Sequence, residues 1–368
     1  MLAGEVSGDH HAAAFVGALK ERAPGVRVLG MGGEHLKAQG VELLAELDRL
    51  AVMGFTEVVS RIPYFWRLER DVVRLIEEER PDLVVLVDYP GFNLRIARAA
   101  HARGCRVLYY IPPKVWAWKR GRARTLAETT DGVATILPFE ADLLRQYGAD
   151  AHFVGSPLVD RRDDVPARGE CFRNWGLDPA RPLLGVLPGS RSQELDEHLG
   201  PFLQIAREVV KQRADVQVVF SRAESMDAAR FEAVEFPVVT ETRALQRWSD
   251  AALVKSGTST LETALERTPL VIAYRTSPLT SWLARRVLRI EHIGLPNLIA
   301  DRRIVPEVLQ DEVTPSVVAP ILLELLDPDG HARAEQLADL DTVIDRLGSP
   351  GASARVAEMA MTIMRGRA

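Results

Sequence analysis

The sequence LVVLVDYPG, at residues 83–91, decides the fold class of this 368-residue chain. Five consecutive apolar residues at 83–87 are typical of a parallel strand buried on both faces, and the Pro-Gly pair ends it. An aspartate, Asp88, directly follows the strand. Open α/β sheets bind their ligands beyond the carboxyl ends of the strands, so this position predicts a functional carboxylate.

The same arrangement recurs at residues 183–191, LLGVLPGSR. Short β-branched runs alternate with amphipathic segments along most of the chain, which predicts an α/β protein with parallel sheets covered by helices. We expect strands at 26–29, 83–87, 107–110, 133–136, 183–187, 216–220, 251–254 and 270–274. We expect helices at 12–22, 68–80, 94–103, 139–147, 195–212, 317–326, 332–347 and 353–365.

The alternation is interrupted at residues 160–169, where DRRDDVPARG combines charge, proline and glycine without an apolar face. This composition is typical of an interdomain linker. We therefore expect a first domain at 1–160, a second at 170–345 and a terminal helical segment at 346–368. Two Rossmann-like domains of similar size that face a cleft are the expected architecture.

The first strand raises a separate question. A doubly wound domain needs a strand before its first helix, yet Met1-Leu2 leads directly into the loop AGEVSGD. Either this strand is a stub of two residues, or the sequence starts downstream of the native start. We favour the second interpretation, because an empty place in a parallel sheet would expose apolar faces.

Composition excludes several classes of protein. Hydrophobic residues make up 47% and charged residues 26%, as in a folded, water-facing domain, and a net charge of −5 gives no reason to expect nucleic-acid binding. The two cysteines, Cys105 and Cys171, have no CxxC spacing and fit a reducing cytosol, so we expect both to be buried. No apolar run approaches the ~20 residues of a membrane span, and the first residues lack signal-peptide features.

The loop AGEVSGD, at residues 3–9, opens a predicted helix and contains Gly4, Glu5, Ser7, Gly8 and Asp9. Small residues at a helix start leave backbone N–H groups free for a phosphate or for sugar oxygens. The alternative is an ordinary turn in which Ser7 or Asp9 caps the helix. The spacing leaves both interpretations open.

Two residues are candidates for catalysis. Asp88 can remove a proton from an alcohol if burial raises its pKa, or it can cap its own turn. In the second domain, Gly189 and Ser190 allow a close approach of backbone to an anion, and Arg191 can bind phosphate oxygens. The alternative for Arg191 is a solvent-facing side chain after a capped turn.

The segment SGTSTLE, at residues 256–262, places small and hydroxyl-bearing residues at a predicted helix start. Gly257, Thr258 and Ser259 can bind phosphate oxygens there, and Glu262 can accept hydrogen bonds from a ribose. The alternative is a capping box formed by Ser259 and Glu262, which is compatible with binding.

Two segments, 61–74 and 281–290, interleave aromatic and aliphatic residues with arginines. This pattern suits an anionic membrane surface or a groove for acyl chains, whereas the alternative is a pair of core helices with arginines at the surface. The candidate residues for acyl or membrane contact are Phe55, Phe65, Trp66, Arg67, Trp282, Arg285 and Arg286. The eight histidines form no HExxH motif, and the chain has no GxSxG motif of a nucleophilic serine. We therefore expect no metal and no cofactor. His10, at the start of the first predicted helix, is a weaker alternative to Asp88 as the base.

Eight motifs together resemble the lipid-A-disaccharide synthase family in order and spacing, from residue 2 to about residue 320. They are AGEVSGD, LAVMGFTEVV (50–59), VDYPGFN (87–93), PPKVWAW (112–118), LPFE (137–140), LPGSR (187–191), SGTSTLE and LPNLIA (295–300). The loop at 112–114 departs from the family, because PPK stands where a serine-containing run such as SPS is expected.

The resemblance implies a glycosyltransferase-B architecture in which the C-terminal helix packs back on the first domain. It implies a metal-independent, inverting transfer from UDP-2,3-diacylglucosamine to 2,3-diacylglucosamine 1-phosphate, at the cytoplasmic face of the inner membrane of Gram-negative bacteria. By the same resemblance Asp88 is the general base, Arg191 binds the diphosphate, and Asn297 completes the cleft. The family also forms homodimers.

Rival functions are a UDP-N-acetylglucosamine 2-epimerase, the peptidoglycan glucosaminyltransferase, or a nucleotide-sugar-binding or membrane-scaffold protein without catalysis. The two basic-apolar segments and the VWAW stretch argue against the first two, and an epimerase needs no groove for acyl chains. The presence of both Asp88 and Arg191 argues against the non-enzyme.

Overall fold

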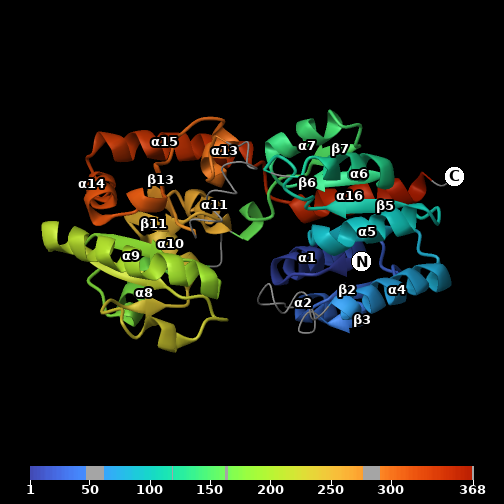
Figure 1. Cartoon of the computed structure of the whole chain (residues 1–368), viewed down its shortest axis with the longest axis horizontal. Helices are drawn as coiled ribbons and strands as arrows, with labels where there is room; N and C mark the ends of the chain where they lie inside the picture. The colour runs from blue at the N-terminus through green and yellow to red at the C-terminus, as the bar shows by residue number, and fades with distance from the viewer. Residues whose placement is uncertain (47–61, 118, 162–164, 277–290, 367–368) are drawn as a thin grey trace. The chain divides into compact units, whose positions relative to one another are not determined.

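The computed structural model describes residues 1–46, 62–117, 119–161, 165–276 and 291–366 (Figure 1). The chain divides into two compact units. Unit 1 comprises Met1–Asp160 and Leu347–Ala368, and unit 2 comprises Arg161–Arg346. Phe55, Trp282, Arg285 and Arg286 lie outside the described residues.

Unit 1 contains a parallel sheet with the strand order β3-β2-β1-β4-β5-β6-β7. The strands are β1 (Leu2–Ala3), β2 (Leu29–Gly32), β3 (Glu42–Glu46), β4 (Val84–Val87), β5 (Val107–Tyr110), β6 (Gly132–Thr135) and β7 (Ala151–Phe153). Its helices are α1 (Val6–Arg22), α2 (Glu34–Ala38), α4 (Ile62–Glu79), α5 (Pro90–His101), α6 (Gly121–Thr129), α7 (Pro138–Arg145) and α16 (Ala352–Arg365).

Unit 2 contains a second parallel sheet with the order β10-β9-β8-β11-β12-β13. The strands are β8 (Leu183–Leu187), β9 (Gln217–Ser221), β10 (Val238–Val239), β11 (Ala251–Lys255), β12 (Leu270–Tyr274) and β13 (Glu307–Leu309). Its α-helices are α8 (Arg168–Trp175), α9 (Ser192–Gln212), α10 (Thr242–Trp248), α11 (Thr258–Leu265), α13 (Leu295–Ala300), α14 (Pro315–Leu325) and α15 (His331–Arg346).

The sheet of unit 1 is buried on both faces, as the apolar run at 83–87 predicted. Val84 and Leu86 point into the core beneath α4 to α7, whereas Val85 and Val87 point to the opposite face, beneath α1 and α16. The C-terminal helix therefore packs within the first unit, where Val356, Ala357 and Ala360 join Phe15 of α1 in one apolar cluster.

The strands at 107–110, 183–187 and 270–274 have the predicted bounds. The strand predicted at 26–29 was wrong by three residues, because β2 runs over Leu29–Gly32 and contains two glycines. Gly30 has a φ of +152°, and a Cβ there would lie 1.7 Å from the carbonyl oxygen of Met1, so only glycine fits beside β1. The place of the first strand is taken by the two residues of β1, which pairs with β2 and β4.

The two cysteines differ in burial. Cys171 is buried as predicted, but Cys105 is only half-buried, so the prediction for Cys105 was wrong.

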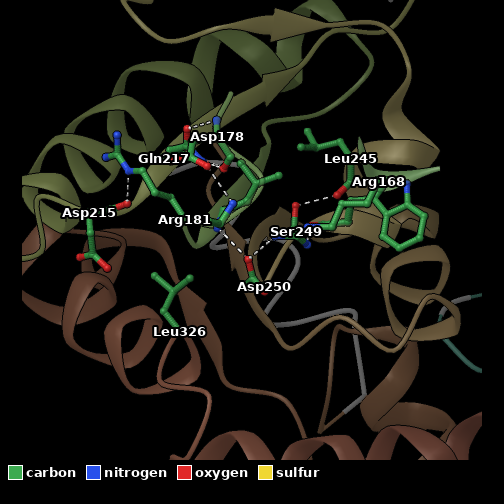
Figure 2. A network of polar contacts seen from close by, with 12 residues as sticks. Arg168, Asp178, Arg181, Asp215, Gln217, Leu245, Ser249, Asp250 and Leu326 are labelled. Atoms are coloured by element: carbon green, nitrogen blue, oxygen red, sulfur yellow. Dashed lines mark hydrogen bonds and ion pairs between the residues drawn. The ribbon is translucent and has the colours of Figure 1, made fainter. Parts of the chain in front are cut away.

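Polar contacts join the amino-terminal ends of the strands in unit 2 (Figure 2). The Asp250 carboxylate accepts hydrogen bonds from the Leu183 N–H at 2.8 Å and from the Arg168 guanidinium at 3.3 Å. Gln217 binds both backbone groups of Asp178, each at 2.8 Å. This network fixes the start of α8 against β8 and β11 within unit 2.

We expect Asp250→Ala to lower the free energy of unfolding by about 1–3 kcal/mol, because it leaves the buried N–H of Leu183 without its acceptor. The matched control is Asp215→Ala, which removes a surface ion pair with Arg213 and should cost at most about 0.5 kcal/mol. Urea unfolding of the full chain measures both. Equal losses in the two variants would contradict this role of Asp250.

Candidate active site

Four of the quoted motifs, AGEVSGD, VDYPGFN, LPGSR and SGTSTLE, lie at the two places where the strand order reverses. In unit 1 the chain reverses direction across the sheet between β1 and β4, and in unit 2 between β8 and β11. The loops after these strands begin at Gly4, Asp88, Pro188 and Ser256. Such switch points are where open parallel sheets bind ligands. In unit 1 the motifs AGEVSGD and VDYPGFN therefore lie at the ends of neighbouring strands. In unit 2 the same holds for LPGSR and SGTSTLE.

The backbone at Asp88 is held in an unusual conformation. Asp88 and Tyr89 have φ angles of 49° and 48°, in the left-handed region that non-glycine residues rarely adopt. The Asp88 carbonyl accepts hydrogen bonds from the Tyr109 hydroxyl at 2.7 Å and from Asn93 Nδ2 at 2.8 Å. The two side chains therefore hold the turn through the Asp88 backbone carbonyl and do not engage the Asp88 carboxyl group.

The surroundings of Asp88 favour a base that works near neutral pH. Burial raises its pKa to about 6, with a further contribution from the negative charge of Glu5, while the Tyr89 N–H and the positive charge of Lys114 oppose the shift. A carboxylate with this pKa is ionised at pH 7 and binds a proton more readily than an exposed aspartate. This is the electrostatic behaviour that a general base for an alcohol needs.

The loop at residues 3–9 divides into structural and exposed positions. A Cβ on Gly4 would lie 2.3 Å from the Tyr89 ring, so this glycine allows β1 and the Asp88 turn to approach. Glu5 is the N-terminal cap residue of α1 without a side-chain cap bond, so the alternative that Ser7 or Asp9 caps this helix is wrong. Gly8 is buried, whereas Glu5 and Ser7 are exposed.

Asp9 is buried and holds the loop after β2. Its carboxylate accepts hydrogen bonds from the N–H groups of Gly33 (2.6 Å), His35 (3.1 Å) and Leu36 (3.3 Å), and it contacts His35 Nδ1 at 3.1 Å. The ring of His10, the alternative base, lies 4.8 Å from the ring of His35. These contacts give Asp9 a structural role beside the candidate site.

A buried carboxyl group that the sequence analysis did not single out lies at the same edge of the sheet. Glu140 accepts hydrogen bonds from Trp116 Nε1 at 3.0 Å and from the Leu137 N–H at 3.3 Å. Burial raises the pKa of Glu140 to about 7, against the hydrogen bonds from Trp116 and Leu137 and the charge of Lys114. The Trp116–Glu140 hydrogen bond joins the segments that follow β5 and β6. Both residues belong to motifs quoted above, Trp116 to PPKVWAW and Glu140 to LPFE, and this was the only signal for the pair in the sequence.

In unit 2 the loop after β8 is shaped by Glu194. Gly189 has a φ of +123°, and a Cβ there would lie 2.8 Å from the Glu194 side chain. The Ser190 N–H donates to Glu194 Oε2 at 3.0 Å, and Lys255 Nζ donates to Glu194 Oε1 at 2.6 Å. Arg191 is exposed and is the N-terminal cap residue of α9, without a side-chain cap bond.

The loop after β11 leads directly into α11. Gly257 is the N-terminal cap residue and Thr258 the first helical residue, so Ser259 lies inside the helix and the predicted capping box is wrong. Thr258 is exposed, while Ser259 and Glu262 are half-buried. The helix start therefore presents small residues at the same sheet edge as Arg191.

Asn297, in α13, is buried and binds the segment that leads from α13 into β13. Its Oδ1 accepts the N–H groups of Ile304 and Val305, each at 2.8 Å, and its Nδ2 donates to the Val305 carbonyl and to Glu307 at 2.9 and 2.7 Å. The structure therefore gives this side chain a local partner for each of its polar atoms.

Helix α4 combines both interpretations of its basic-apolar sequence. Leu68, Val72 and Ile76 are buried in the core, and Phe65 packs against it. Trp66 is 60% exposed, and Arg67 is exposed beside it. A hollow of about 970 Å³ lies along this helix; its lining residues are Pro63, Trp66, Arg67, Glu69, Arg70, Val73, Arg74, Glu77, Arg95 and Arg103.

The described residues contain neither a metal-ligand cluster nor a helix suited to span a membrane. No group of three or more His, Cys, Asp or Glu side chains is placed to hold a metal ion. None of the helices there has the length and apolar character to cross a membrane.

Known structures share this fold. The glycotransferase of kitacinnamycin aligns with a TM-score of 0.66 at 15% identity, over 99% of this chain and 98% of that one. The UDP-GlcNAc 2-epimerase from Neisseria meningitidis bound to UDP-GlcNAc aligns with a TM-score of 0.61 at 10% identity, over 92% and 100%. These TM-scores show a common fold of two parallel-sheet α/β units, the glycosyltransferase-B class.

Sequence comparison is more specific. The family model for lipid-A-disaccharide synthetase matches residues 1–360. A lipid-A-disaccharide synthase from Myxococcus xanthus is 41% identical over 372 residues, which cover 99% of this chain and 97% of the relative. The chain belongs to the lipid-A-disaccharide synthase family.

Proposed function

We propose that this protein is an inverting glycosyltransferase of lipid A biosynthesis. It transfers the sugar of UDP-2,3-diacylglucosamine to 2,3-diacylglucosamine 1-phosphate and forms a β-1,6-linked disaccharide and UDP. Family membership supports the reaction. The observation that carries the proposal in the structure is Asp88, a half-buried carboxylate at a switch point with a pKa of about 6.

Unit 1 binds the acceptor in this proposal. The Asp88 carboxylate takes the proton from the acceptor 6-hydroxyl, and the oxygen forms a bond to the anomeric carbon of the donor. The bond between that carbon and the phosphate oxygen breaks, and its electron pair leaves with UDP. One displacement inverts the anomeric carbon and therefore yields the β linkage.

Unit 2 binds the UDP-sugar in this proposal. Helices α9 and α11 begin at the same edge of the sheet, and their first N–H groups attract phosphate oxygens. Gly189, Ser190 and Arg191 contact the diphosphate from one loop, and Gly257, Thr258 and Ser259 from the other. The guanidinium stabilises the charge that develops on the leaving diphosphate, and Glu262 accepts hydrogen bonds from the ribose.

Membrane binding through the exposed face of α4 completes the proposal, with the protein on the cytoplasmic face of the inner membrane. Trp66 is exposed, and the hollow beside it is lined by Arg67, Arg70 and Arg74, so an apolar ring and several cations face one side. This combination suits an anionic lipid surface.

The homodimer that the resemblance implies remains a prediction, and sedimentation of the purified chain tests it.

We expect Trp66→Ser to weaken binding to vesicles that contain anionic phosphatidylglycerol by roughly 10-fold, because one large apolar contact is lost. Val317→Ser is the matched control, since Val317 is an exposed apolar residue of unit 2. Vesicle co-sedimentation measures both variants. Equal binding by Trp66→Ser and the unaltered chain would contradict a membrane role for this face of α4.

The function is tested with purified protein, detergent micelles and both diacylated sugars, with UDP and disaccharide measured by mass spectrometry. We expect equal amounts of the two products, and only when both acylated sugars are present. Epimerisation of unacylated UDP-N-acetylglucosamine, without a new glycosidic bond, would overturn the proposal.

A further inference from the structure

One glutamate and one histidine of α9 connect the loops after three neighbouring strands of unit 2. The strands are β8, β11 and β12, which lie side by side in the sheet. The residues are Glu194, in the first turn of α9, and His198, one turn later. Neither takes part in the reaction described above.

The Glu194 side chain joins the first two loops. Its Oε2 accepts the Ser190 N–H at 3.0 Å, in the loop after β8. Its Oε1 accepts Lys255 Nζ at 2.6 Å, at the end of β11. The side chains of Glu194 and Lys255 are only 18% and 13% exposed, so water screens this ion pair weakly.

His198 joins the third loop to the same residue. Its ring is 1% exposed; Nδ1 lies 2.6 Å from the Glu194 carbonyl oxygen, and Nε2 accepts the Arg275 N–H at 2.9 Å. A backbone N–H can only donate, and a carbonyl can only accept. Nδ1 therefore carries the proton, Nε2 carries the lone pair, and the ring is neutral.

The charges around the two residues are consistent with these contacts. Burial raises the pKa of Glu194, but the hydrogen bond and charge of Lys255, the Ser190 N–H and the charge of Arg191 together hold the pKa below its usual value. Burial and the charge of Lys255 lower the pKa of His198, while the Glu194 carbonyl and the charges of Glu194 and Glu197 act in the opposite direction. At neutral pH the glutamate is charged and the histidine is not.

We propose that Glu194 and His198 are positioning residues for the UDP-sugar. Glu194 sets the loop that presents Ser190 and Arg191 and neutralises Lys255, and His198 fixes the Arg275 backbone beside them. Neither needs to touch the diphosphate. The inference rests on the proposed function, because it assigns the UDP-sugar to this edge of unit 2.

The test compares Glu194→Ala and Glu194→Gln by calorimetry with UDP and by steady-state kinetics. We expect Glu194→Ala to raise the UDP dissociation constant and the donor KM by roughly 10- to 100-fold, with the acceptor KM unchanged, because the anion-binding loop is displaced. Glu194→Gln keeps one acceptor for the Ser190 N–H, so the UDP dissociation constant and the donor KM should rise less than in Glu194→Ala. Glu208→Gln, on the exposed part of the same helix, is the matched control without effect.

Lys255 distinguishes positioning from direct binding. If Lys255 is held by Glu194 and does not bind the diphosphate, the double variant Glu194→Gln with Lys255→Gln should bind UDP better than Glu194→Ala, because the pair stays neutral and an acceptor for the Ser190 N–H remains. A larger loss of UDP affinity in the double variant than in Glu194→Ala would assign the diphosphate to Lys255 and overturn this part of the proposal.

His198 is tested by two variants and one spectrum. His198→Gln keeps an acceptor for the Arg275 N–H and should bind UDP more tightly than His198→Phe, which fills space without one. A proton–nitrogen NMR spectrum of the imidazole should show the proton on Nδ1. A proton on Nε2, or equal UDP affinity in the two variants, would overturn the role of His198.

The outcomes separate this inference from the proposed function. Lower melting temperatures with unchanged UDP affinity and donor KM would leave Glu194 and His198 as stabilising residues only and overturn the inference, even if the disaccharide is formed. Impaired UDP binding in these variants would support the inference even if the unaltered chain forms no disaccharide, in which case only the proposed function fails.

Discussion

Asp88→Asn is expected to lower kcat by about 10²–10⁴-fold, because an amide cannot take the proton of the acceptor hydroxyl. UDP affinity should stay unchanged, since the proposed UDP groups belong to unit 2. The fold should persist too, because the turn is held by the Asp88 backbone and by Asn93 and Tyr109. Asp142→Asn, a surface carboxylate paired with Arg145 in the same unit, is the matched control and should keep full activity.

The pH dependence gives a second, independent readout of the same residue. The active form of Asp88 is ionised, and burial raises its pKa to about 6. The value of kcat/KM for the free enzyme should therefore fall as the pH decreases through about 6, and this limb should disappear in Asp88→Asn. Full turnover by Asp88→Asn together with a loss in His10→Ala would instead assign the base to His10.

Arg191→Ala is expected to lower kcat/KM by about 10²–10³-fold, because the guanidinium stabilises charge that develops on the leaving diphosphate. Arg191→Lys should recover only part of the loss, since an ammonium cannot form two parallel hydrogen bonds to phosphate oxygens. Steady-state kinetics at saturating acceptor measure the effect.

The control for Arg191 is Arg207→Ala, in the same helix, where the guanidinium pairs with Glu235 at the surface. It should leave kcat/KM unchanged. A full rate in Arg191→Ala would contradict a role for this side chain at the diphosphate and would leave the loop backbone as the binding element.

Much of the fold was predictable because buried parallel strands are continuous apolar runs. The runs at 107–110, 183–187 and 270–274 had the observed bounds, and 83–87 differed from β4 by one residue. The bounds of β2 were predicted wrongly because glycines such as Gly30 and Gly32 are rare in strands. Gly30 is required by the close approach of Met1, and this contact exists only in the folded sheet. The strands β1, β7, β10 and β13 have only two or three residues each, and β3, with the sequence ELLAE, is not a continuous apolar run.

The candidate site was predictable only in part. Motif positions at strand ends located the loops, since parallel strands end at one edge of a sheet. The contacts within the loops could not be predicted, because they join residues far apart in the chain. Asp9 binds the N–H of Gly33, Trp116 binds Glu140, and Lys255 binds Glu194. Two of these carboxylates, Glu140 and Glu194, therefore went unnoticed in the sequence.

In the proposed reaction one displacement, assisted by Asp88, joins two acylated glucosamine units. The most direct measurement is the configuration of the new glycosidic bond, determined by NMR on the disaccharide formed by the purified chain. We predict a β-1,6 linkage, with one UDP released per disaccharide. An α linkage would contradict the account, because retention of configuration needs a step that a single displacement does not provide.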